Sequence, residues 1–172
     1  TMQADMTDLR AYISEHPDFP RPGILFRDIS PLLREQLPAT LGALEALLSP
    51  GEWSGIDTIG VIDARGFVLG AGLAARLGKG VVMIRKAGKL PPPVHRLAYG
   101  LEYGSATLEV RSGTGRLLLV DDVLATGGTL RAAASLVVAA GFELAGAIVL
   151  ADLGLVSGLD IAGRPVSAVL HY

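Results

Sequence analysis

After residue 51 the chain alternates short apolar runs with longer segments of helical periodicity. The apolar runs lie at 58–62, 81–84, 117–120, 144–150 and 166–170. Their residues are apolar at consecutive positions, which is typical of strands covered on both faces. Segments 67–77 and 128–140 have helical spacing, and each is followed by a glycine that would end the helix. This pattern predicts an α/β fold in which a central parallel sheet is flanked by helices.

The residues before 51 predict a smaller N-terminal region. Residues 7–16 favour a short amphipathic helix, which a proline must end. Residues 17–29 contain three prolines and a glycine beside several apolar residues, so we expect a structured loop held by its aromatic side chains. A serine and a proline then begin a helix that runs to about Ser49. We expect one domain, with residues 7–50 as a cap region and residues 51–172 as the core.

The interval from Lys86 to Gly104 has neither helical nor strand periodicity and contains three consecutive prolines. It is longer than the usual connection between elements of a compact domain. Long connections without regular structure often cover a functional site. The sequence therefore predicts a long mobile loop here.

Composition narrows the possible functions. The chain has 172 residues, with 15 Lys and Arg against 17 Asp and Glu, and a net charge of −2. This balance argues against binding to nucleic acid or to an anionic membrane, because both require a positive surface. The absence of cysteine excludes thiol nucleophiles and cysteine-bound metals. A mean hydropathy of +0.46 shows that the 22 glycines belong to a packed protein rather than a disordered one.

One stretch, from Ala132 to Ala151, is long enough to cross a bilayer and has Glu143 as its only charge. The sequence Gly141-Phe142-Glu143 in its middle predicts a helix end and a turn, which divides the stretch into a helix and a buried strand. The N-terminal residues also lack the apolar core of a signal peptide. We therefore expect a soluble cytoplasmic protein.

The most informative segment is LLLVDDVLATGGT, residues 117–129. A buried strand delivers Asp121 and Asp122 to its carboxyl end, where α/β sheets bind ligands. Two glycines let the backbone approach an oxyanion, which the N–H groups of the following helix and two threonine hydroxyls can bind. Ionised carboxylates accept hydrogen bonds from sugar hydroxyls. The segment predicts a monophosphate site beside a site for a sugar diol.

This segment resembles the phosphoribosyl diphosphate (PRPP) binding motif of the type I phosphoribosyltransferases. Several further segments resemble the adenine phosphoribosyltransferases within that group, in order and spacing, over residues 7 to about 150. The matching segments are PDFPRPGILFRDISPLL (17–33), IDARGF (62–67), IRKAGKLP (84–91), LEYG (101–104) and VDDVLATGGT (120–129). The resemblance implies a type I phosphoribosyltransferase fold, a homodimer, and purine salvage by transfer of the 5-phosphoribosyl group of PRPP to adenine, giving AMP and diphosphate.

The resemblance also assigns the PRPP site. Asp121 and Asp122 would bind the ribose hydroxyls, and Mg²⁺ would bridge those hydroxyls and the diphosphate, carried by the substrate without direct protein ligands. The residues implied for the ribose 5-phosphate are Ala125, Thr126, Gly127, Gly128 and Thr129. The cations implied for the diphosphate are Arg65, Arg85, Lys86 and Lys89, of which Arg65 is also expected to act in catalysis by stabilising the leaving group.

Base recognition and proton transfer are implied for two other segments. Phe26 would stack on the adenine ring, while backbone groups of Leu25 and Arg27 read its polar edges. Glu102 would be the general acid and base near N7, and Tyr103 would help to close the site.

Three further expectations follow from the same resemblance. Relatives that act on 6-oxopurines have an aspartate where this chain has Ala125. Asp63 would have a supporting role. A non-proline cis peptide is expected within residues 63–65, at Asp63–Ala64.

Two alternatives remain open at this point. The first is a PRPP-sensing regulator without catalytic activity, although proteins of that kind have a basic surface and this chain has a net charge of −2. The second is a phosphoribosyltransferase for another base such as xanthine, against which the segment 17–28 and Ala125 both argue.

Overall fold

The structure is a computed structural model that describes residues 8–101 and 104–172. Its contacts group into two compact units, residues 1–43 and residues 44–172. The larger unit contains the sheet and the segment with the two adjacent aspartates. We describe the larger unit first and the smaller one separately.

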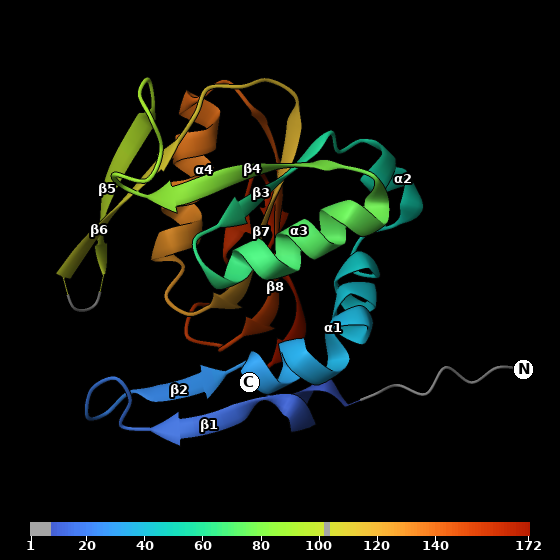
Figure 1. The fold of residues 1–172 in the computed structure, drawn as a ribbon, viewed down its shortest axis with the longest axis vertical. Helices are drawn as coiled ribbons and strands as arrows, with labels where there is room; N and C mark the ends of the chain where they lie inside the picture. Colours follow the sequence, from blue (N-terminus) through green and yellow to red (C-terminus); the bar gives the residue numbers. More distant parts are fainter. Residues whose placement is uncertain (1–7, 102–103) are drawn as a thin grey trace, which may run out of the picture. The chain divides into compact units, whose positions relative to one another are not determined.

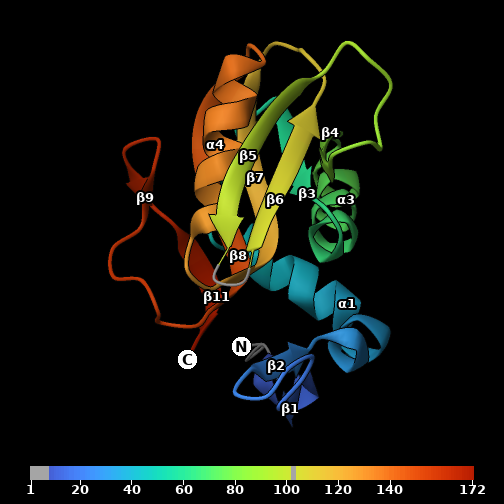
Figure 2. The ribbon, with the colours of Figure 1, turned by 90° about the vertical axis from the view of Figure 1, so that its left-hand side faces the viewer.

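The described residues of the larger unit form a seven-stranded sheet in the order β11-β8-β7-β3-β4-β6-β5. Its parallel part consists of β11 (Ser167–His171), β8 (Glu143–Asp152), β7 (Arg116–Leu124), β3 (Thr58–Ile62) and β4 (Gly80–Lys86). These are the strands that the apolar runs predict. β6 (Gly104–Val110) and β5 (His95–Leu101) continue the sheet in antiparallel orientation beyond β4, so the sheet is mixed rather than wholly parallel (Figures 1 and 2).

Strands β5 and β6 contradict the expectation of a long loop without regular structure over residues 86–104. Leu97 and Tyr99 of β5 pack against the hydrophobic core, while the residues that alternate with them, Arg96, Ala98 and Gly100, are polar or small. This alternation covers few residues and is interrupted by Gly100, so the sequence signal is weak. Backbone hydrogen bonds to β6 stabilise β5 as a strand where its side-chain pattern alone does not predict one. The connection between β4 and β5 is therefore only residues 87–94.

Helices cover both faces of the sheet, as predicted. α3 (Arg65–Leu77) packs on β3, β4 and β7, and α4 (Gly128–Ala139) packs on the opposite face (Figure 1). Gly70 allows α3 to approach the sheet closely, because a Cβ there would lie 2.2 Å from Val61 Cγ1. α3 ends at Gly78 in the left-handed conformation, with φ of 65°. None of the helices in the described part of the chain is long and apolar enough to cross a membrane.

The helix expected over residues 30–49 is shorter and kinked. α1 (Ser30–Glu45) has a non-helical conformation at Gln36 and contains Pro38, which cannot donate the regular helical hydrogen bond. A second helix, α2 (Pro50–Ser54), follows with a capping box between Ser49 and Glu52. The larger unit also contains a small hairpin of β9 (Asp160–Ile161) and β10 (Arg164–Pro165).

The smaller unit contains a hairpin that the sequence interpretation missed. Asp8 caps a single 3₁₀ turn, η1 (Leu9–Tyr12), instead of the longer amphipathic helix expected over residues 7–16. β1 (Ser14–Pro17) then pairs in antiparallel orientation with β2 (Leu25–Asp28), which lies inside the expected loop. The backbone pairing of the two strands provides hydrogen bonds that a helix continuing toward Pro17 could not make.

Candidate active site

Three neighbouring parallel strands bring most of the predicted PRPP residues to one edge of the sheet. β3 pairs with β4 on one side and with β7 on the other. Residues 63–65 follow β3, Arg85 and Lys86 end β4, and residues 121–129 include the end of β7 and the turn into α4. Because the carboxyl ends of parallel strands lie at the same edge, these segments form one candidate site.

The adjacent acids at the end of β7 are both buried. Asp121 is 8% exposed and Asp122 is 7% exposed. The Asp122 backbone N–H donates to Asp121 Oδ1 at 2.9 Å. Burial, and then the neighbouring Asp122 carboxylate, raise the pKa of the Asp121 carboxyl well above its ordinary value. The carboxyl end of β7 therefore holds an acid, Asp121, whose charged form is disfavoured in the free protein.

The start of α3 packs against this acid pair. Arg65 Nε lies 2.6 Å from Asp122 Oδ2, which gives the pair one cationic partner. Gly66 is required next to Arg65, because a Cβ there would lie 2.9 Å from Asp121 Oδ1 and 3.1 Å from the Val120 carbonyl oxygen. The peptide bond between Asp63 and Ala64 is cis, which confirms the prediction for this turn.

Asp63 contacts the end of β4. Its Oδ2 lies 3.4 Å from both Arg85 Nε and the Lys86 backbone nitrogen. The Arg85 guanidinium also lies over the Phe67 ring, 5.6 Å from the ring centroid. Asp63 and Phe67 therefore fix Arg85 from two sides, while Lys86 is exposed.

The turn between β7 and α4 has the backbone expected of an anion site. Gly127 has φ of 84°, in the left-handed region that favours glycine, and no side chain among the described residues caps the N-terminus of α4. Arg131 Nη1 donates to the Thr126 carbonyl oxygen at 3.2 Å. The Tyr99 hydroxyl of β5 lies 3.3 Å from the Thr129 hydroxyl. The turn thus contacts both its own helix and the β5–β6 hairpin.

One buried acid near this edge was missed by the sequence interpretation. Glu109 of β6 has a side chain that is 0% exposed and lies 3.0 Å from Arg96 Nε. Its Oε1 accepts backbone hydrogen bonds from Lys89 at 2.7 Å and from Leu90 at 2.6 Å. In the sequence Leu108-Glu109-Val110, an acid between two apolar residues indicates a strand position that faces solvent. The burial of Glu109 becomes visible only when residues 87–94 are seen to lie against it.

The predicted base-binding residues belong to the smaller unit. Leu25, Phe26 and Arg27 lie in β2 rather than in an irregular loop. The rings of Phe26 and Phe19 meet edge to face at 5.2 Å between centroids. Arg27 Nε pairs with Glu15 Oε1 at 3.1 Å.

The predicted catalytic residues Glu102 and Tyr103 lie outside the described residues. The residues on either side of them, Leu101 and Gly104, are paired with each other as the last register pair of β5 and β6.

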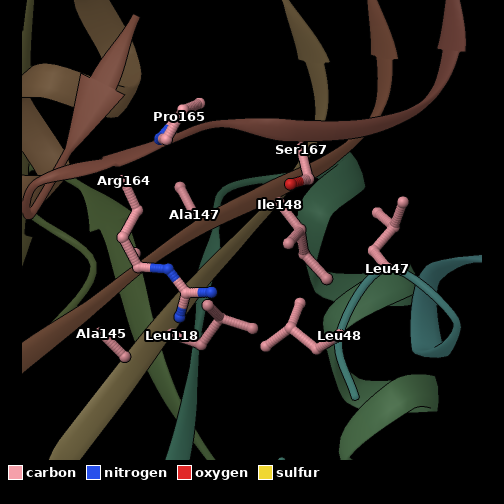
Figure 3. A pocket seen from close by; sticks show the side chains of 10 residues that line it. Leu47, Leu48, Leu118, Ala145, Ala147, Ile148, Arg164, Pro165 and Ser167 are labelled. Atoms are coloured by element: carbon pink, nitrogen blue, oxygen red, sulfur yellow. The ribbon is translucent and has the colours of Figure 1, made fainter. Parts of the chain in front are cut away.

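A cavity of about 170 Å³ lies elsewhere in the larger unit (Figure 3). It is lined by parts of β7, β8, β10 and β11 together with Leu47 and Leu48, and it contains none of the predicted site residues. Arg164 is the charged residue among its lining residues, and it is paired with Glu52. Within residues 8–101 and 104–172, no three His, Cys, Asp or Glu residues are grouped so as to hold a metal ion.

Comparison with known proteins places this geometry in a family. Residues 48–155 match the phosphoribosyl transferase domain family. Adenine phosphoribosyltransferases from Bdellovibrio bacteriovorus and Methylococcus capsulatus are 43% and 48% identical to the chain, over 96% and 97% of it and over 99% and 100% of their own lengths.

Solved structures agree with these sequence matches. Adenine phosphoribosyltransferase from Rhodothermus marinus is 42% identical, with a TM-score of 0.83 over 97% of this chain and 98% of that one. The Saccharomyces cerevisiae enzyme, solved in complex with adenine, is 32% identical with a TM-score of 0.86, over 96% of this chain and 98% of that one. The chain therefore belongs to the adenine phosphoribosyltransferase family of the type I phosphoribosyltransferases.

Proposed function

We propose that the protein catalyses purine salvage by transferring the 5-phosphoribosyl group of PRPP to adenine, with AMP and diphosphate as products. One observation carries this proposal. The acid pair of β7, the uncapped turn into α4 and the arginines that follow β3 and end β4 lie at one sheet edge, in a chain that matches adenine phosphoribosyltransferases over nearly its whole length.

PRPP binding uses the end of β7 and the turn that follows it. Asp121 and Asp122 accept hydrogen bonds from the ribose 2- and 3-hydroxyls. Residues 125–129, which are Ala125, Thr126, Gly127, Gly128 and Thr129, surround the 5-phosphate with backbone N–H groups and threonine hydroxyls. The left-handed Gly127 and the absence of a side-chain cap on α4 support this role, because they leave the donors of the turn available to an anion.

Magnesium enters this proposal as part of the substrate. Mg²⁺ prefers oxygen ligands and keeps several waters, so it suits the hydroxyl and diphosphate oxygens of PRPP. When bound, it neutralises charge on the departing diphosphate. The buried acid pair fits a substrate of this kind, since Asp122 is already paired with Arg65 and the carboxylates would accept hydrogen bonds from the ribose hydroxyls rather than form a separate metal site.

The negative charge of the departing diphosphate is stabilised by cations at the same edge of the sheet. Arg65 acts on the diphosphate in the reaction, with Arg85, Lys86 and Lys89 as further diphosphate ligands. The orientation of Arg85 by Asp63 and Phe67 supports this assignment, because a fixed guanidinium binds an anion with less loss of side-chain entropy. It also gives Asp63 the supporting role that the sequence resemblance implies.

Adenine binding and proton transfer complete the proposed reaction. Phe26 stacks on the purine, and backbone groups of Leu25 and Arg27 read its edges. Glu102 transfers the proton near N7, and Tyr103 helps to close the site. The Glu102→Gln variant should lose turnover without loss of thermal stability. Unchanged turnover would contradict the assignment of the proton to Glu102.

The protein is proposed to act as a homodimer. Val68 of α3 and Val81 and Met83 of β4 are 45%, 44% and 46% exposed, and α3 packs against β4. A group of exposed apolar side chains is what an interface between copies would bury. Sedimentation of the wild-type chain and of a Met83→Lys variant tests this assembly, and a monomeric wild type would contradict it. A cytoplasmic location remains a prediction from the sequence.

The reaction is tested by incubating the protein with PRPP, Mg²⁺ and each purine in turn while diphosphate release is measured. We expect release with adenine and little with guanine, hypoxanthine or xanthine. Release with one of those bases and none with adenine would refute the substrate assignment. Binding of PRPP without release with any base would support a regulator instead of an enzyme.

A further inference from the structure

We propose that Glu109 is a positioning residue for the diphosphate subsite: it holds residues 87–94, here called the 87–94 loop, in the conformation that presents Lys89. This inference rests on the proposed function, because it assigns Lys89 to diphosphate. It adds a residue that does not contact substrate and acts through the loop.

The position of Glu109 in the sheet explains how it can hold the loop. Its direct cross-strand neighbours are Arg85 of β4 and Arg96 of β5. Leu108 and Val110, on either side of it, belong to the hydrophobic core on the face that α4 covers. Glu109 therefore faces the opposite side of the sheet, and yet its side chain is 0% exposed.

Both carboxylate oxygens of Glu109 have donors. Oε1 accepts the backbone N–H groups of Lys89 and Leu90 at 2.7 Å and 2.6 Å, and Oε2 accepts from Arg96 Nε at 3.0 Å. Two consecutive amides of the loop thus converge on one oxygen of a strand residue. Such charge-assisted bonds are among the stronger ones in proteins, and they fix the backbone from which the Lys89 side chain extends.

The charge of Glu109 persists over the working pH range. Burial by itself raises the pKa of the Glu109 carboxyl, but the backbone N–H groups of Leu90, Gly88 and Lys89 and the Arg96 guanidinium outweigh it and lower that pKa to about 2. An ionised acid near a diphosphate would normally repel it. Here the charge is buried and paired, so it orders the loop, while the exposed Lys89 side chain remains available to the ligand.

Two other contacts hold the loop on either side of Lys89 and Leu90, independently of Glu109. The Ala87 backbone N–H donates to the Thr107 carbonyl oxygen at 2.9 Å, and Arg111 Nη1 donates to the Pro91 carbonyl oxygen at 3.3 Å. Loss of the Glu109 charge should therefore release Lys89 and Leu90 and leave Ala87 and Pro91 in place. The expected result is a local change at Lys89 and Leu90 rather than unfolding of the hairpin.

The test compares Glu109→Gln with Glu143→Gln. The first variant keeps the side-chain volume but places an amide NH₂ group against donors. The second neutralises an exposed acid that pairs with Arg116 on another strand pair, so it is a matched control. Calorimetry measures the Kd of Mg²⁺-diphosphate and of AMP for each variant, and hydrogen exchange measures the Lys89 and Leu90 amides.

We expect Glu109→Gln to weaken Mg²⁺-diphosphate binding by about 10-fold or more, to leave AMP binding within about 2-fold, and to speed exchange of the two amides. The control should match the wild type in all of these. If both ligands weaken equally, or if diphosphate binding is unchanged, the positioning role is wrong. If Glu109→Gln does not fold, the Arg96→Met variant is measured instead. We expect it to weaken Mg²⁺-diphosphate binding by a smaller factor, and an unchanged Kd would contradict the positioning role.

The two proposals fail in different ways. A wild type that binds neither AMP nor diphosphate contradicts the proposed function and this role together. A wild type that makes AMP from adenine, with a Glu109→Gln variant that binds diphosphate normally, contradicts this role alone.

Discussion

Two buried acidic centres in the same sheet are organised in opposite ways. At the end of β7, Asp121 and Asp122 lie next to each other, with Arg65 paired to Asp122. On β6, Glu109 is alone among acids, and both of its oxygens have donors. The pKa of Asp121 is raised by burial and by its acidic neighbour, whereas the pKa of Glu109 is lowered to about 2.

We interpret this difference as one between an acid that supports the fold and an acid pair that is proposed to bind a ligand. The Glu109 carboxylate already has donors to both oxygens in the free protein, because the chain itself supplies them. Among the described residues, Asp122 Oδ2 is buried and, apart from its ion pair with Arg65, has no hydrogen-bond donor, and the sugar hydroxyls of the proposed substrate would supply one. Burial alone therefore does not mark a candidate binding acid, whereas burial with a raised pKa and an acidic neighbour favours one.

The largest effect is expected for Asp121→Asn. The neutral amide removes the repulsion from Asp122 and the cost of burying a charge, so the melting temperature of the free protein should rise. Loss of the charged acceptor that is proposed for a ribose hydroxyl should lower kcat/KM by roughly 100-fold. Calorimetry and steady-state kinetics on the same preparation measure both effects.

The pH dependence of this stabilisation has a definite sign. A raised folded-state pKa means that Asp121 destabilises the wild type progressively as the pH rises from its unfolded value through the folded one. The difference in melting temperature between Asp121→Asn and the wild type should therefore grow over that window. A variant less stable than the wild type at neutral pH would show that Asp121 belongs to the same class as Glu109.

An intermediate effect is expected for Arg65→Met. The substitution leaves the buried Asp122 carboxylate without the guanidinium that lies 2.6 Å away, so the melting temperature should fall. PRPP binding should weaken by roughly 10-fold, because the same cation is assigned to the diphosphate. Stability and binding thus change together here, and a variant with unchanged PRPP affinity would limit Arg65 to pairing with Asp122.

The smallest effect concerns the acid titration of Glu109. A lowered folded-state pKa contributes stability that is present above the ordinary value of 4.5 and is lost as the pH falls toward about 2. The stability advantage of the wild type over Glu109→Gln should therefore shrink in that window and stay constant above it. Urea unfolding at a series of pH values measures this, and an advantage that is independent of pH would contradict the pairing.

The sequence predicted the parallel strands, both flanking helices and the cis peptide at Asp63–Ala64, because continuous apolar runs and a specific family resemblance are strong signals. It did not predict the strands whose local side-chain pattern is weak and which form because they pair with another strand. The hairpins β1–β2 and β5–β6 contain short, glycine-interrupted or proline-flanked alternation, which backbone hydrogen bonds to a partner strand complete.

The two acidic centres show the same limit. Adjacent aspartates before a glycine pair mark Asp121 and Asp122 as candidates by local sequence alone. Glu109 has no such local signal, because its donors come from Lys89, Leu90 and Arg96, which are 13 to 20 residues away along the chain. A buried acid satisfied by distant backbone can be recognised only once the chain is folded.

The contrast between the two centres is tested most directly by following the side-chain carboxyl carbons of Asp121 and Glu109 by NMR from about pH 4 to about pH 8, with and without AMP. We predict a titration step for Asp121 above its ordinary range in the free protein, shifted to lower pH by AMP, and no step for Glu109 in either state. A Glu109 step within this range, or an Asp121 carbon that behaves as an ordinary aspartate and ignores AMP, would contradict the account.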